Sequence, residues 1–144
     1  MTAWSDITGY LETHGSCAVV TVVELFGSGP REIGARLIVA PDGSFKGTIG
    51  GGTLEWQALA AAQTMLPASS PGMSERKYGL GPDLGQCCGG YVTLAYELFT
   101  SDSDLGFSQK ASRASERGPV WVESRYGDEG VNRRSIEPDQ PPQQ

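Results

Sequence analysis

Cysteine, clustered positive charge and long apolar runs are all scarce in this sequence. Its three cysteines are an odd number and two are adjacent, which disfavours the disulfide framework of a small secreted domain. The net charge is −6 without any basic run, which argues against nucleic acid or an anionic membrane as the main partner. No stretch approaches the ~20 apolar residues of a membrane span, and the N-terminus lacks the basic region of a signal peptide. We therefore expect a cytoplasmic protein with reduced thiols.

The apolar residues are unevenly distributed along the 144 residues. They recur in short stretches from Trp4 to Phe99, whereas beyond that point the one compact apolar group is residues 120–122. A core can form where apolar residues are concentrated. We expect a folded domain over residues 1–100, followed over residues 101–144 by a polar, partly disordered extension with a possible short strand near 120–122.

The spacing of apolar residues predicts an α+β fold. Trp4, Ile7 and Leu11 lie at helical spacing before Gly15, which predicts a short N-terminal helix. Helix formers dominate residues 53–66, which predicts a long helix. Val-rich, alternating or turn-bounded segments predict strands at residues 17–25, 35–40, 44–48, 75–78 and 92–98. The expected architecture is a mostly antiparallel sheet with the long helix packed on it.

Three consecutive glycines, Gly50, Gly51 and Gly52, connect a predicted strand to the long helix. Without Cβ atoms this backbone adopts positive φ and lets a ligand approach its amides. The unpaired amides at Thr53 and beyond lie at the positive end of the helix dipole, where an anion such as a phosphate is stabilised. The alternative is a tight turn in which Thr53 and Glu55 only cap the helix.

Two arginines, Arg31 and Arg36, flank a glycine-rich segment between two predicted strands. Pro30 and the strand pattern that follows argue against a dinucleotide-binding fingerprint there. A guanidinium near the end of a strand can bind a phosphate through two parallel hydrogen bonds. The alternative is surface pairing with Glu32 or Glu24.

The adjacent cysteines Cys87 and Cys88 are flanked by glycines and are open to approach. Thiolates are soft ligands and nucleophiles, so the pair suits a soft metal centre, a persulfide or redox chemistry. A structural zinc site needs four ligands, and only Cys17 and His14 remain to complete one. The alternative is that one thiol packs as a small hydrophobic group. Cys17 itself is expected in an apolar strand, and His14 at the surface end of a helix.

Three motifs in one order carry a family resemblance. They are Gly-Ser-Gly-Pro-Arg-Glu-Ile-Gly-Ala-Arg at 27–36, Asp-Gly-Ser-Phe-Lys-Gly-Thr-Ile-Gly-Gly-Gly-Thr-Leu-Glu at 42–55 and Leu-Gly-Pro-Asp-Leu-Gly-Gln-Cys-Cys-Gly-Gly at 80–90. Together they resemble the N-terminal domain of the xanthine dehydrogenase accessory protein (XdhC/CoxI) family, over about residues 5–99. Relatives continue into a Rossmann-like domain, whereas nothing after Phe99 offers the glycine-rich strand-to-helix unit for one.

The resemblance implies a chaperone more than an enzyme. Such proteins bind the molybdenum cofactor (molybdopterin) transiently, protect it while a cysteine desulfurase supports sulfuration, and deliver it to a xanthine dehydrogenase-type apoenzyme. The implied cofactor contacts are a phosphate on Gly50 to Thr53 with Arg31 or Arg36, and the metal on Cys87 or Cys88. A homodimer that completes the site from two subunits is compatible with so small a domain.

Two other functions compete with the chaperone hypothesis. In the first, a thiolate of the cysteine pair carries persulfide sulfur as an enzyme would, and a stable adduct would be visible by mass spectrometry. In the second, the chain is a non-catalytic assembly module whose glycines only make turns. Replacing the cysteines would then leave partner binding intact.

Overall fold

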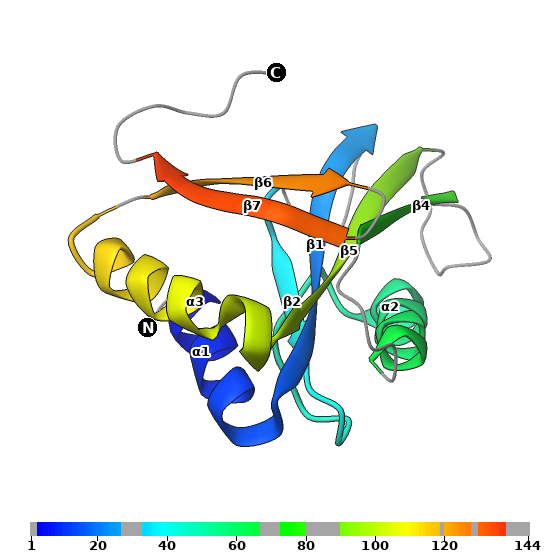
Figure 1. Ribbon diagram of the computed structural model, residues 1–144. Coiled ribbons are helices and arrows are strands. Elements are labelled where there is room, and N and C mark those ends of the chain that lie inside the picture. The colour runs from blue at the N-terminus through cyan, green and yellow to red at the C-terminus, as the bar shows by residue number, and fades with distance from the viewer. Residues whose placement is uncertain are drawn as a thin grey trace.

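A five-stranded antiparallel sheet forms the centre of the structure (Figure 1). The computed structural model describes residues 3–26, 33–66, 73–79, 90–118, 120–127 and 130–137. In chain order the elements are α1 (Ala3–His14), β1 (Ser16–Phe26), β2 (Arg36–Val39), β3 (Phe45–Gly47), α2 (Gly52–Met65), β4 (Met73–Gly79), β5 (Tyr91–Thr100), α3 (Ser101–Ser115), β6 (Trp121–Gly127) and β7 (Gly130–Glu137).

The strand order in the sheet is β3-β2-β1-β5-β4, so β1 is the central strand. It pairs antiparallel with β2, where Val19 faces Ile38, and with β5, where Val20 faces Tyr96. β3 and β4 add antiparallel at the two edges. Because β1 is rich in valine and its apolar residues are nearly continuous, both faces of the central strand can be buried.

Helices cover both faces of this sheet, as Figure 1 shows. On one face α2 buries Leu54, Ala58 and Ala62 against alternate residues of the strands, among them Leu37 and Leu94. On the other face α1 contributes a second cluster, with α3 and the start of the β6–β7 hairpin packed beside it. The sheet therefore separates two apolar cores.

The predicted fold class is confirmed. The sheet is antiparallel, the long helix packs on it as α2, and the short N-terminal helix is α1.

The turn around Asp42 joins β2 to β3 as a hairpin in which Ile38 pairs with Lys46. The Asp42 carboxylate accepts hydrogen bonds from the Ser44 amide and hydroxyl, at 2.9 and 2.6 Å, which stabilises that turn.

Beyond residue 100 the chain is more regular than its composition indicates. α3 follows β5 directly, and the Asp104 carboxylate accepts a hydrogen bond from the Thr100 amide at 2.9 Å. The helix buries Ser108 and Ala111, which are too small or too polar to produce an apolar pattern in the sequence. β6 spans the position where a short strand was predicted, and it pairs with β7. None of the helices in the described ranges is long and apolar enough to cross a bilayer.

Candidate functional site

Antiparallel pairing brings the described residues next to the predicted site segments toward one end of the sheet. β3 runs toward this end and finishes at Gly47, directly before the glycine turn. β1 runs the same way and finishes at Phe26, opposite Tyr91 at the start of β5. Gly79, the last residue of β4, also pairs with Tyr91. The described residues on either side of segments 27–32 and 80–89 thus lie toward the same end of the sheet as the glycine turn. At this end β1 and β5 extend further than β3 does.

The glycine turn has the backbone conformation that its sequence predicts. Gly50, Gly51 and Gly52 have φ of 121°, 74° and 70°. Residues with a Cβ rarely adopt such φ values, so three successive positive φ angles require glycine here. A Cβ on Gly51 or Gly52 would meet no atom within 4 Å, so the requirement comes from the backbone and not from crowding.

The Glu55 carboxylate holds this turn from the inside. Its Oε1 accepts hydrogen bonds from the Thr48 hydroxyl at 2.6 Å, the Ile49 amide at 3.1 Å and the Gly51 amide at 3.2 Å. The Thr48 hydroxyl oxygen in turn accepts a hydrogen bond from the Gly50 amide at 3.0 Å. Glu55 therefore has the capping role considered from the sequence, and it uses two of the amides that could otherwise meet an anion.

Burial and hydrogen bonding act in opposite directions on the pKa of the Glu55 carboxyl. Partial burial alone raises this pKa, but the hydrogen bonds from Thr48, Ile49 and Gly51 outweigh burial and hold the pKa below its ordinary value. The charged form of Glu55 is thus more stable in the folded protein than in the unfolded chain. The stabilisation is present above the unfolded pKa and is lost as the pH falls through the folded pKa.

We expect Glu55→Gln to lower the free energy of unfolding by ~1 kcal/mol at pH 7, because the charged acceptor of three hydrogen bonds is lost. The difference from wild type should shrink as the pH falls through the folded-state pKa of Glu55, which lies below its ordinary value. Urea denaturation at pH 7 and pH 3 measures both values. Glu75→Gln on β4 is the matched control, and a difference that persists unchanged at pH 3 would contradict the assignment.

The start of α2 remains open to solvent beyond the amides that Glu55 uses. Gly52 and Thr53 are exposed, and the N-cap residue, Gly51, has no side chain with which to cap the amides of this helix. The first amides of a helix have no partner within it and lie at the positive end of its dipole. Of the amides in this turn, those of Gly52 and Thr53 are therefore the ones that remain available to a ligand.

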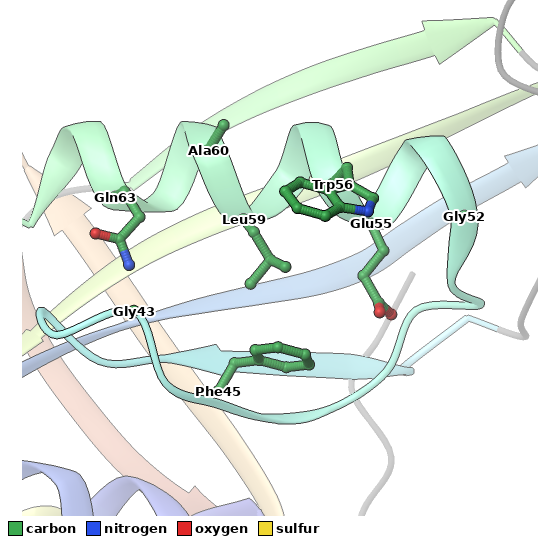
Figure 2. A pocket seen from close by; sticks show the side chains of 8 residues that line it. All are labelled: Gly43, Phe45, Gly52, Glu55, Trp56, Leu59, Ala60 and Gln63. Carbon is green, nitrogen blue, oxygen red and sulfur yellow. The ribbon is translucent and has the colours of Figure 1, made fainter.

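A groove of about 510 Å³ runs beside the turn, between α2 and the β2–β3 hairpin (Figure 2). Its walls are mostly apolar, and two of its aromatic side chains are conspicuously exposed: Trp56 at 76% and Phe45 at 45%. The lining residues are Gly43, Phe45, Gly52, Glu55, Trp56, Leu59, Ala60 and Gln63. Because Gly52 and Glu55 belong to both, the groove and the glycine turn form one continuous surface.

The Arg36 side chain does not lie beside the glycine turn. It is on the same face of β2 as Ile38, opposite the face covered by α2. There it lines a cavity of about 70 Å³ with residues of α1 and β6, among them Ile7 and Val122. The structure therefore groups Gly50, Gly51, Gly52 and Thr53 but does not bring the Arg36 guanidinium to them.

The remaining predicted ligands, Arg31, Cys87 and Cys88, lie outside the described residues. Cys17 is buried in β1, as expected. His14 ends α1, with its Nε2 3.9 Å from Asp42 Oδ2 and its ring against Tyr10. Across the part of the chain that the structure describes, no three His, Cys, Asp or Glu side chains are grouped as metal ligands.

The groove was not predicted from the sequence. One signal for it was available: Trp56 lies two residues after Leu54, off the buried stripe of the helix, where a large aromatic side chain has no packing role. Phe45 gave no comparable signal, because it alternates with Lys46 in a strand of ordinary appearance. Only the hairpin brings these two side chains to one groove.

Comparison of the sequence with known proteins identifies the class to which the chain belongs. Residues 10–79 match the model of the XdhC and CoxI family. The chain belongs to this family, through the region of the family's N-terminal domain.

Two individual proteins are similar to this chain. The chain is 33% identical over 107 residues to the molybdenum cofactor insertion chaperone PaoD of Escherichia coli (strain K12), a match that covers 72% of this chain and 32% of the relative. A solved structure described as a xanthine dehydrogenase from Bacillus halodurans superposes with a TM-score of 0.68 at 23% identity, covering 96% of this chain and 43% of that one. This second likeness shows a shared fold. The chain thus spans about a third of the length of the curated relative.

Proposed function

We propose that this protein binds the molybdenum cofactor and assists its sulfuration and its insertion into a xanthine dehydrogenase-type molybdoenzyme. Family membership supports this proposal, as does a relative described as a molybdenum cofactor insertion chaperone. In this role the protein is a chaperone that holds the cofactor transiently, and a cysteine desulfurase is the expected source of sulfur.

The observation that carries the proposal is the exposed glycine turn at the start of α2. The molybdenum cofactor carries a phosphate, and the Gly52 and Thr53 amides offer unpaired donors in the field of the helix dipole. Gly50 and Gly51 give the backbone the conformation that exposes these donors. The bound group would supply the metal centre that the molybdoenzyme needs, and this chain would supply its binding and protection.

We assign the metal end of the cofactor to Cys87 and Cys88, with Arg31 as an additional phosphate ligand. The assignment rests on the softness of thiolates as ligands and on the family motif that contains the pair. Arg36 has no part in the proposal, because its side chain lies on the opposite face of the sheet from α2.

Titration of the purified protein with isolated molybdenum cofactor tests the proposal. We expect saturable binding by the wild type and a loss of at least about tenfold in affinity for Cys87→Ala or Cys88→Ala, the minimum expected when groups around a metal are removed. Met73→Ala on β4, which removes an exposed apolar side chain, is the control and should bind like the wild type. Unchanged affinity in both cysteine variants would overturn the thiol assignment, and absence of binding by the wild type would overturn the function.

A further inference from the structure

The proposed function does not explain why Trp56 and Phe45 are exposed. Trp56 projects from the middle of α2 with 76% of its surface exposed, and Phe45 faces the helix from β3 with 45% exposed. Exposing two large aromatic side chains to water in one place is unfavourable. Apolar surface concentrated in a groove commonly marks a binding site.

The groove has the dimensions and the walls of a site for a flat ring. Trp56, Leu59, Ala60 and Gln63 follow at i, i+3, i+4 and i+7, so they form one stripe along α2. In Figure 2 the Leu59 side chain points toward Phe45 across the groove. The volume of about 510 Å³ lies within the range of sites that hold small molecules.

Two polar side chains of the groove offer acceptors. All three hydrogen bonds to Glu55 end on Oε1, and no donor among the described residues bonds to its second oxygen, Oε2. The Gln63 amide nitrogen donates one hydrogen bond to the Ala40 carbonyl at 3.2 Å, and the side-chain oxygen of Gln63 can accept another. Among the described lining residues Glu55 is the charged one. This part of the groove therefore favours an uncharged ring that carries N–H donors.

We propose that this groove binds an amino-substituted heteroaromatic ring, with the ring against Trp56 and Phe45 and an amino group donating to Glu55 Oε2. The inference rests on the proposed function and extends it: Gly52 lines the groove and also ends the glycine turn, so one molecule can place its phosphate on the turn and its ring in the groove. Two parts of a molybdenum cofactor have this chemistry, namely the pterin itself and a nucleobase attached to it.

Chemical-shift mapping on the full 15.3 kDa chain separates these sources. Neopterin, a pterin without phosphate, and cytidine 5′-monophosphate serve as probes, and the indole N–H signal of Trp56 is the readout. A saturable shift with either probe, without a shift of the buried Trp4, supports the inference and identifies the ring. If neither probe shifts the Trp56 signal, the inference is overturned. It is also overturned if this signal shifts only when a xanthine dehydrogenase-type apoenzyme is added.

Variants separate failure of this inference from failure of the proposed function. Trp56→Ala and Phe45→Ala should each weaken binding of the active probe and of the molybdenum cofactor by about tenfold, as expected for the loss of one aromatic contact to a heterocyclic ring. Both positions are exposed, so the fold should tolerate the changes, and Met73→Ala is again the control. If the wild type and both groove variants bind the cofactor equally well, the groove inference fails while the proposed function stands. If the wild type binds no cofactor, the proposed function fails.

Discussion

Gly47→Ala is expected to lower the free energy of unfolding by about 2–5 kcal/mol, because two unfavourable terms add at this position. Gly47 has a φ of +86°, which is costly for any residue with a Cβ. An added Cβ would also clash with the carbonyl oxygen of Arg36. That oxygen belongs to the backbone of β2 and cannot move aside without breaking the β2–β3 pairing.

The matched control is Gly34→Ala. Gly34 has a similar φ of +97°, but nothing lies within 4 Å of its added Cβ, so only the backbone term of about 1–2 kcal/mol applies. Chemical denaturation of both variants separates the steric term from the conformational one. Equal losses for the two variants would show that the hairpin relaxes around the new Cβ. Because β3 leads directly into the glycine turn, Gly47→Ala should also weaken ligand binding, whereas Gly34→Ala should not.

Leu54→Ala is expected to cost about 2–5 kcal/mol, the usual range for a large buried aliphatic residue replaced by alanine. Leu54 is 1% exposed and packs in the core between α2 and the sheet. It also follows Thr53 directly, so it anchors the end of the helix where the proposed anion-binding amides lie. We therefore expect weaker cofactor binding together with the loss of stability.

Leu59→Ala on the same helix is the comparison for stability. Leu59 is only partly buried at the edge of the core, so its replacement should cost about 1 kcal/mol or less. Thermal and chemical denaturation of the two variants, followed by circular dichroism, measures the difference. Similar losses in both variants would contradict the view that α2 is anchored mainly through the stripe Leu54, Ala58 and Ala62.

The sequence predicted the local elements well because their signals are local. Helix formers between the glycine turn and Pro67 predict α2 within a residue at each end, and valines predict the central strand β1. Three successive glycines predict a turn with positive φ, which the structure has. The alternating pattern of β5 predicts a core strand, yet it could not show that Thr93 and Ala95 on the second face are buried as well. The second face is covered by other elements, namely α1, α3 and the start of the β6–β7 hairpin, which the pattern of one strand cannot reveal.

Tertiary structure alone decided three features of the site. Alternation places Arg36 with Ile38 on one face of β2 and Leu37 with Val39 on the other, but only packing shows which face α2 covers. The groove requires Phe45 and Trp56 from separate elements, and no local pattern relates them. The sequence raised both capping by Glu55 and anion binding for the turn amides. The folded backbone assigns Ile49 and Gly51 to Glu55 and leaves Gly52 and Thr53 exposed, because hydrogen bonding depends on atomic positions that composition and spacing do not specify.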